Sequence, residues 1–166
     1  LGHRLPVTLS LVIGSTLIAV VVGVLLGVAS SRGKALLGRS VDVLSILGMA
    51  IPSFWVALVL VTFFSISLGW LPATGYVPLS ESPSRWLLAL VLPLTALSLP
   101  AITAIAKQAR ESMLDVGASE HVRILRLNGI PERSIVYKHV LRGSAIRITT
   151  VAGLQFVAAL GGSVVI

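Results

Sequence analysis

The residues with the most distinctive chemistry gather in and around one basic stretch, RILRLNGIPERSIVYKHVLRGSAIR, which spans residues 123–147. This stretch contains His139, and His121 precedes it by two positions. Two histidines eighteen positions apart, in a chain without cysteine, do not match the ligand spacing of a zinc site, so we predict no metal site. The sequence has no glycine-rich phosphate loop of the Walker type and no nucleophile paired with a base, so we predict no catalytic residues.

The composition places this basic stretch in an integral membrane protein. Hydrophobic residues make up 55% of the chain, charged residues only 11%, and the mean hydropathy is +0.99. These values lie well outside the usual range of soluble domains. The formal net charge of +7 would suit a nucleic-acid partner only if the basic residues covered one free surface, so their positions decide the matter.

Four apolar segments are long enough to cross the roughly 30 Å hydrocarbon core of a bilayer. Their approximate bounds are residues 5–30, 43–69, 86–106 and 146–166, and none holds Asp, Glu, Lys or His in its interior. We therefore predict an all-α fold, a polytopic transmembrane helical bundle. Since the chain begins at a leucine and ends within an apolar segment, we expect it to be a fragment of a longer protein.

The distribution of lysine and arginine predicts the orientation of these spans. Eleven of the 13 Lys and Arg residues lie in or at the edge of the first and third connections between spans. The second connection, LPATGYVPLSESPSR, has three prolines and a single arginine. By the positive-inside rule, the first and third connections face the cytoplasm and the second faces outward. The positive charge is then explained by topology, and we predict no nucleic-acid partner.

The third connection, about residues 107–145, is too long for a simple link and is predicted to form a helix, a turn and a second helix. Its first ten residues continue the helix of the third span. Ser119 is the expected N-cap of the next helix, and Gly129 lies just past the end of that helix. Pro131 then stands at a first helical position with Glu132 in the first turn, which predicts the start of another helix.

The short helix after Ser119 carries Arg123 and Arg126 on one stripe. Its apolar residues spread over most of the remaining circumference; they are Val122, Ile124, Leu125 and Leu127. Such a helix is too apolar for water and too charged for hydrocarbon. We expect it either to dock onto a cytoplasmic partner protein or to lie on anionic lipid headgroups.

Small residues and prolines mark several places within the spans. Gly23 and Gly27 form a small-xxx-small pattern that lets two helices approach closely. Pro93 and Pro100 predict kinks in the third span. Pro52, which an aromatic pair follows, predicts either a kink beside a transport pathway or an interfacial anchor, and the sequence does not choose between them.

Five further blocks resemble, in the same order along the chain, the integral membrane permeases of ATP-binding cassette importers: MAIPSFWVALVL, LGWLPATGY, LPLTALSLPAI, ARESMLDV and GLQFVAALGGSVV. The basic stretch is similar to the cytoplasmic loop of that family, with Gly129 as the loop glycine. The resemblance covers essentially the whole chain and is closest to the dipeptide, oligopeptide and nickel branch. The chain departs from the pattern at Ile124 and Leu125, where small residues are usual, at His121, where an aromatic is common, and at Arg147, where a proline is expected.

The resemblance implies a fragment of the type I ABC importer permease fold, with one transmembrane domain over residues 1–166. The helix from about Ser119 to Asn128 would be the coupling helix, which sits in a groove of an ATPase subunit. The implied coupling interface comprises Ser119, Glu120, His121, Val122, Arg123, Ile124, Leu125, Arg126, Leu127, Asn128, Gly129 and Ile130. The translocation pathway would include Pro52, Ser53, Phe54, Gly161, Gly162 and Ser163.

The resemblance also implies an importer of short peptides in the bacterial inner membrane, with nickel as the alternative cargo. The expected partners are a second, similar permease, two cytoplasmic ATPase subunits, an extracytoplasmic substrate-binding protein and membrane lipid. The chain itself is then no enzyme and holds no cofactor, since ATP and Mg would bind to the ATPase subunits. From the residues alone, an ion-coupled secondary transporter or a channel stays an alternative, because membrane segments outside this sequence could hold intramembrane charges.

The charge asymmetry predicts the outcome of a labelling experiment. Single cysteines are introduced as Ser80→Cys in the second connection and Ser119→Cys in the third, and intact cells are treated with a membrane-impermeant maleimide. We expect labelling at position 80 and protection at position 119, because only the second connection faces outward. Labelling of position 119 from outside the cell would overturn the orientation.

Overall fold

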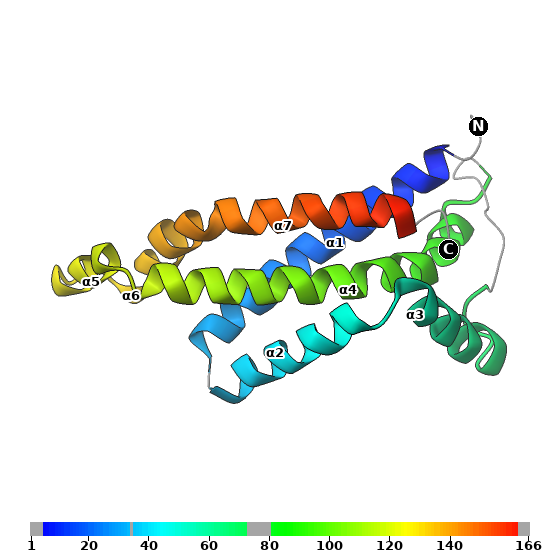
Figure 1. Ribbon diagram of the computed structural model, residues 1–166. Helices are drawn as coiled ribbons and strands as arrows, with labels where there is room; N and C mark the ends of the chain where they lie inside the picture. The colour runs from blue at the N-terminus through cyan, green and yellow to red at the C-terminus, as the bar shows by residue number, and fades with distance from the viewer. Residues whose placement is uncertain (1–4, 34, 73–80, 163–166) are drawn as a thin grey trace.

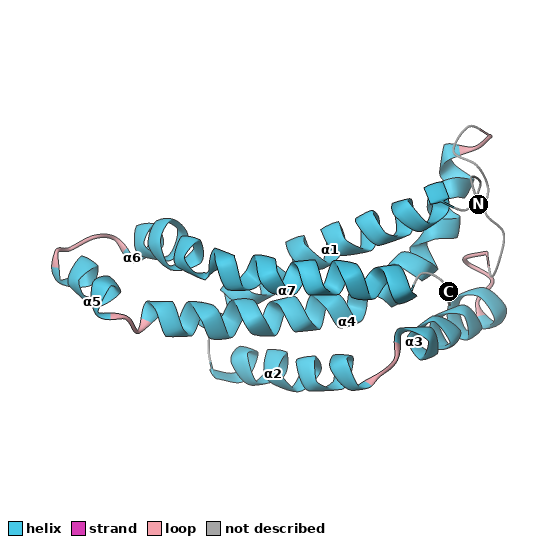
Figure 2. Cartoon of the chain, turned by 45° about the horizontal axis from the view of Figure 1, so that its top comes forward, coloured by secondary structure: helices cyan, strands magenta, loops and turns pink. Residues whose placement is uncertain are grey.

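The computed structural model describes residues 5–33, 35–72 and 81–162. Every regular element in these ranges is a helix, which confirms the predicted all-α class (Figures 1 and 2). The elements are α1 (Leu5–Arg32), α2 (Ala35–Ala50), α3 (Ser53–Leu60), the π-helix η1 (Val61–Ser67), α4 (Pro83–Gly117), α5 (Glu120–Leu127), α6 (Glu132–Ser134), the π-helix η2 (Ile135–Val140) and α7 (Leu141–Gly162).

Within the described ranges, three continuous helices are long and apolar enough to cross a membrane. They are α1, α4 and the run from Glu132 to Gly162, in which α6, η2 and α7 follow one another without a break. The first, third and fourth predicted spans lie inside these helices, apart from the last four residues of the chain, which fall outside the described residues. Both α4 and the Glu132–Gly162 helix extend well beyond the predicted spans, toward the end of the bundle that carries α5 (Figure 1).

The second predicted span, residues 43–69, is a bent pair of helices and not one straight helix, and it is a fourth span if the pair crosses the membrane as one unit. The chain forms two helical segments, Leu36–Ala50 and Ser53–Ser67, whose axes meet at 96°. Pro52 lies at the break in an extended conformation, with φ −63° and ψ 140°. Proline has no N–H to donate and disfavours helical geometry in the residue before it, so helix α2 ends ahead of it. The π-helical turns of η1 were not predicted either, because the sequence carries no signal for them.

Helix α1 packs directly against α4 through its small residues, which confirms the close approach predicted for Gly23 and Gly27. A Cβ on Gly23 would stand 2.9 Å from the Cβ of Ile105. A Cβ on Gly27 would overlap that of Ala109 and would lie 3.0 Å from the backbone oxygen of Ala106. Without side chains at these positions, the two backbones come close enough for extensive van der Waals contact, which is the main attraction between helices in a bilayer.

Helix α2 packs on another part of α4, again through small residues. The Ser45 hydroxyl donates a hydrogen bond to the backbone oxygen of Thr103 over 2.9 Å. A Cβ on Gly48 would overlap the side chain of Thr103. A Cβ on Gly38 would overlap the guanidinium of Arg110. Helix α4 is therefore the element against which both α1 and α2 are built.

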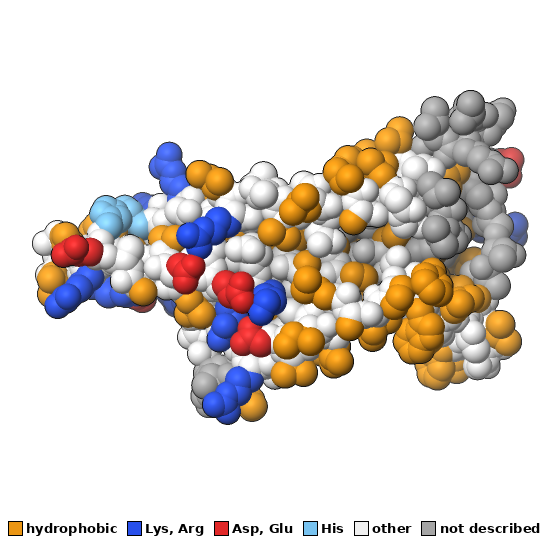
Figure 3. All heavy atoms as spheres, viewed as in Figure 1, with side chains coloured by type: hydrophobic (Ala, Val, Ile, Leu, Met, Phe, Trp, Pro, Cys, Tyr) orange, Lys and Arg blue, Asp and Glu red, His pale blue; other side chains and the backbone are white. Residues whose placement is uncertain are grey.

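The lengths of the helices carry α5 away from the bilayer. At 1.5 Å per residue, the 35 residues of α4 extend over about 52 Å, well over the roughly 30 Å of hydrocarbon. Residues 107–117, the charged end of this helix, account for about 16 Å of that length. Most charged side chains visible in Figure 3 lie over the half of the molecule that carries α5, whereas apolar ones cover the end that carries α3.

The α1–α4 contact predicts a test with a matched control. Gly27→Ala places a methyl group against Ala109 and the α4 backbone, so it should lower the stability of the purified protein by about 1–3 kcal/mol through overpacking. Gly153→Ala puts the same methyl group on α7, where no described atom lies within 4 Å, so it should leave stability unchanged or raise it slightly. Thermal unfolding in detergent measures both. Equal midpoints for the two variants would contradict the close packing.

Candidate functional site

Helix α5 begins and ends as the sequence predicts. The Ser119 hydroxyl accepts a hydrogen bond from the backbone N–H of Val122 over 3.5 Å and caps the start of the helix. At the other end, the N–H of Gly129 donates to the Arg126 oxygen and that of Ile130 donates to the Leu125 oxygen, which is the Schellman arrangement. Gly129 has φ +73°, a conformation that other residues adopt at a cost. The predicted N-cap and the loop glycine are confirmed.

The helix after this turn differs from its prediction in one respect. Pro131 is the residue before the first helical turn, not its first member, and Glu132 opens the helix. The helix then continues without a break to Gly162, so the predicted loop of about residues 107–145 is largely the extension of two spanning helices. The true connection is short, and it consists of α5 with a few residues on either side.

One face of α5 is buried against its own chain. Val122 is 1% exposed, and Leu125 and Ile130 pack around it, half-buried. The buried members of this cluster are Val28, Met113, Val122, Ile135, Val136 and Val140, from α1, α4, α5 and η2. Within this chain Val122 is therefore covered and Leu125 is partly covered, and the assignment of both to a docking surface stays a prediction. The outward apolar residues of α5 are Ile124, 50% exposed, and Leu127, 79% exposed.

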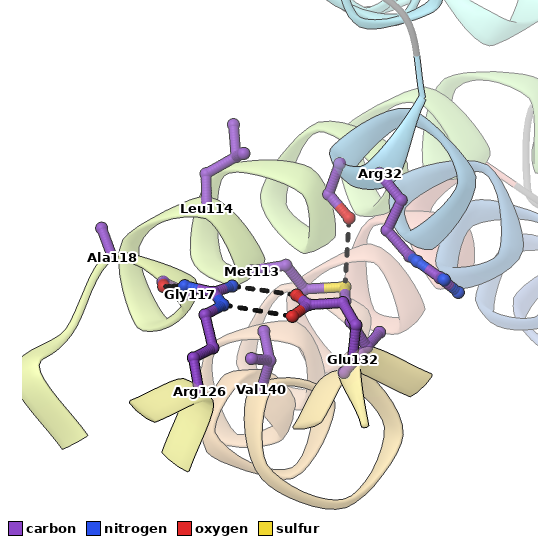
Figure 4. A pocket seen from close by; sticks show the side chains of 10 residues that line it. Arg32, Met113, Leu114, Gly117, Ala118, Arg126, Glu132 and Val140 are labelled. Atoms are coloured by element: carbon purple, nitrogen blue, oxygen red, sulfur yellow. Dashed lines mark hydrogen bonds and ion pairs between the residues drawn. The ribbon is translucent and has the colours of Figure 1, made fainter. Parts of the chain in front are cut away.

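Arg126 also faces its own chain and does not share an outward stripe with Arg123. Its Nε and Nη2 atoms donate to the two carboxylate oxygens of Glu132 over 3.1 and 2.9 Å. Its Nη1 atom donates to the backbone oxygen of Gly117 over 3.1 Å. Figure 4 shows the guanidinium and the carboxylate face to face. The hydrogen bond to Glu132 raises the pKa of Arg126, which stays charged. Arg123 is exposed and has no ion-pair partner among the described residues.

An open groove of about 430 Å³ lies beside this ion pair (Figure 4). Its walls come from the end of α1, the end of α4 and the start of the Glu132–Gly162 helix, and Arg32, Met113, Arg126 and Glu132 contribute to them. The Arg32 guanidinium lies 5.8 Å from the ring centre of Tyr137, within the range of a cation–π contact. The groove therefore belongs to the junction where α5 meets the ends of the long helices.

The two histidines that the sequence separates by eighteen positions come together at this junction. The ring centres of His121 on α5 and His139 on η2 lie 5.9 Å apart. Within the described ranges, no third His, Cys, Asp or Glu completes a group of three that could hold a metal ion. The pair is a further contact between α5 and the helix that follows it.

Ion pairs between helices are features that sequence analysis missed. Arg110 of α4 lies 3.5 Å from Asp42 of α2, and Arg147 of α7 lies 2.8 Å from Asp115 of α4. Opposite charges far apart in the sequence give no signal of their pairing. By contrast, Lys107 and Glu111 pair within α4 at the i, i+4 spacing, which could have been found from the sequence.

The residues predicted for a translocation pathway are only partly brought together. A Cβ on Gly162, at the end of α7, would lie 3.6 Å from the hydroxyl of Ser53, at the start of α3. Phe54 and Pro52 are exposed, and Gly161 has no described neighbour near its Cβ position. Ser163 lies outside the described residues. Ser53, Gly162 and Leu97 thus lie close together where α3, α7 and α4 meet.

Long apolar helices, two of which are joined by the short helix α5, define a polytopic membrane protein. The chain belongs to the family described as the inner membrane component of binding-protein-dependent transport systems, which matches residues 5–166. The recognised resemblance is thereby confirmed, and family membership replaces the alternatives of an ion-coupled transporter or a channel.

Relatives of known name agree with this family. A putative peptide transport system permease protein of Brucella abortus is 38% identical over 167 residues, covering 100% of this chain and 53% of that protein. The oligopeptide transport system permease proteins OppB of Salmonella typhimurium and AppB of Bacillus subtilis are 36% and 32% identical, covering 97% and 98% of this chain and 51% and 52% of theirs. The chain spans about half the length of these relatives, whose names refer to peptides and not to nickel.

The conformation of Gly129 predicts how the junction responds to substitution. At φ +73° a β-branched side chain is strained, although no described atom lies within 4 Å of a Cβ there. Gly129→Val should lower the free energy of local opening of α5 by roughly 1–3 kcal/mol. Asn tolerates this conformation better, so Gly129→Asn should have a clearly smaller effect. Hydrogen exchange of the peptide containing α5 measures the opening. Equal exchange in the two variants would show that backbone strain is not the cause.

Proposed function

We propose that this chain is part of a permease subunit that moves short peptides across the inner membrane in an importer driven by separate ATPase subunits. In this proposal α5 is the coupling helix. A second permease subunit, two cytoplasmic ATPase subunits and an extracytoplasmic binding protein complete the assembly. ATP and Mg bind to the ATPase subunits, and this chain is not itself an enzyme. The peptide cargo is inferred from the names of the relatives.

The observation that carries the proposal is the position of α5. The charged end of α4 is about 16 Å long, and α5 lies beyond it. A helix resting on lipid headgroups should lie along the membrane border with a broad apolar face toward the lipid. The apolar face of α5 is instead turned inward through Val122 and Leu125. What remains outside is a small surface around Ile124 and Leu127, which suits insertion into a groove on a partner protein.

Charge supports the same partner-facing surface. Arg123, like Ile124 and Leu127, is exposed on α5, whereas Arg126 is held by its own chain. An outward surface with two apolar side chains and Arg123, which has no ion-pair partner among the described residues, offers both buried area and electrostatic guidance to a partner. We infer that this surface of α5 enters the ATPase groove, while the inward surface holds α5 on the permease.

A pathway for the cargo is proposed near the outer end of the bundle. Support comes from the approach of Ser53 and Gly162, from α3 and α7, next to Leu97 of α4. The break at Pro52 leaves backbone groups at this level without helical partners, and such groups occur within membranes where they line a protein cavity. Residues of the rest of the subunit and of the second permease would complete the pathway.

The outward surface predicts a test of docking. Leu127→Asp changes a side chain that is 79% exposed on the permease, so the full-length subunit should insert and accumulate normally. In the ATPase groove the new carboxylate would be taken out of water, which costs several kcal/mol, so recovery of ATPase subunits in a pull-down and peptide uptake should both fall at least tenfold.

A matched control lies on the same helix. Val122→Asp should prevent accumulation of the subunit, because Val122 is buried within the chain itself. Membrane abundance separates the two effects. Normal ATPase recovery and normal uptake with Leu127→Asp would refute α5 as the docking element.

A further inference from the structure

The Arg126 side chain connects three helical elements at the junction. The residue belongs to α5, its carboxylate partner Glu132 opens α6, and its backbone partner Gly117 is the last residue of α4. The other ion pairs in the described part of the chain join at most two elements, and Lys107 with Glu111 joins none, since both lie in α4. All three guanidinium nitrogens of Arg126 donate a hydrogen bond, so three of its five N–H groups are used within the chain.

Apolar contact and ion pair fix different degrees of freedom of α5. Val122 sits in the cluster at the junction and holds α5 down, but apolar attraction is non-directional and leaves α5 free to rotate or tilt about this point. A guanidinium that grips a carboxylate through two parallel hydrogen bonds has a defined geometry. Since α5 has eight residues, too few for a stable isolated helix, its orientation depends on such contacts.

We infer that Arg126 is a positioning residue that locks α5 to both long helices, so that a displacement of α5 moves α4 and the Glu132–Gly162 helix together. This inference rests on the proposed function, in which an ATPase displaces α5. Without the lock, an ATPase can still bind the outward surface around Leu127, but its movement turns α5 on the Val122 anchor and reaches the spanning helices only in part. Loss of the lock should therefore separate ATP hydrolysis from transport, and leave docking intact.

Because the ion pair between Arg126 and Glu132 is exposed, its role in positioning α5 can be tested separately from folding. The side chains of Arg126 and Glu132 are 46% and 53% exposed, and exposed ion pairs contribute little to stability. Variants that remove one charge are expected to insert and to assemble. If Arg126 orients α5, its loss should lower the amount of peptide taken up per ATP hydrolysed. A residue that contributed only to stability would leave this ratio unchanged.

The experiment uses the full-length permease assembled with its second permease, ATPase subunits and binding protein in proteoliposomes. Arg126→Gln, Glu132→Gln and the double variant are compared for ATPase recovery, ATP hydrolysis and uptake of a radiolabelled oligopeptide. We expect normal recovery, and peptide taken up per ATP hydrolysed should fall about tenfold in each single variant, within the usual range of coupling between sites. The double variant should fall about tenfold as well, not a hundredfold, because both changes remove one contact.

Glu111→Gln is the matched control. It removes an ion pair of the same 2.9 Å length and similar exposure that lies within α4, so uptake per ATP should stay at the wild-type value. Wild-type coupling in both single variants would overturn the inference. So would losses that multiply in the double variant, an equal loss in Glu111→Gln, loss of ATPase recovery in Arg126→Gln, or failure of both single variants to accumulate. If the wild-type assembly itself recovers no ATPase or takes up no peptide, the proposed function fails instead.

Discussion

The close approach of α1 and α4 is the contact on which the rest of the fold depends. In a bilayer, lipid tails are as apolar as leucine, so burying apolar side chains gives little net attraction between helices. Close packing supplies it instead, and it requires small residues where two backbones meet. Gly23 and Gly27 meet Ile105 and Ala109 in this way, and Ala19 continues the same face of α1 in the buried cluster with Ala109. Once α4 is fixed against α1, it offers surfaces to α2 and α7.

Outside the predicted hydrocarbon region the same helix uses a different kind of contact. Along its charged end, Arg110 pairs with α2, Asp115 pairs with α7, and the Gly117 oxygen accepts a hydrogen bond from α5. Polar links are inexpensive here because water solvates the parts of these groups that stay exposed. Helix α4 thus uses two kinds of contact. Van der Waals packing holds the neighbouring helices along its apolar part, and directional polar contacts orient the neighbouring helices along its charged end. The junction where α5 meets the ends of the long helices lies in the second region.

Sequence analysis succeeded where local signals decide the structure. The N-cap at Ser119, the positive φ at Gly129 and the glycine pattern of α1 each follow from one or two residues, and the structure has all of them. It failed where tertiary contacts decide. A proline signals a break at position 52, but the 96° angle depends on how the following helix meets α4. Likewise, nothing in the order of residues 122–127 tells which side of α5 faces its own chain, so the burial of Val122 and the partial burial of Leu125 were not predicted.

The unequal burial of the long helices bears on how the junction transmits movement. In the apolar stretch of α4, 44% is buried inside the described structure. In the corresponding stretch of the Glu132–Gly162 helix, only 11% is buried. Ile146, Leu154 and Val157 stand at 80%, 64% and 65% exposure on α7, a surface that meets lipid or another protein segment in the membrane. Shifting a lightly packed helix breaks fewer contacts than shifting α4, which is gripped by α1 and α2. Because Arg126 ties α5 to both helices, the inferred displacement of α5 carries both of them, and it disturbs fewer contacts along the helix that Glu132 opens and that carries Gly162 beside Ser53.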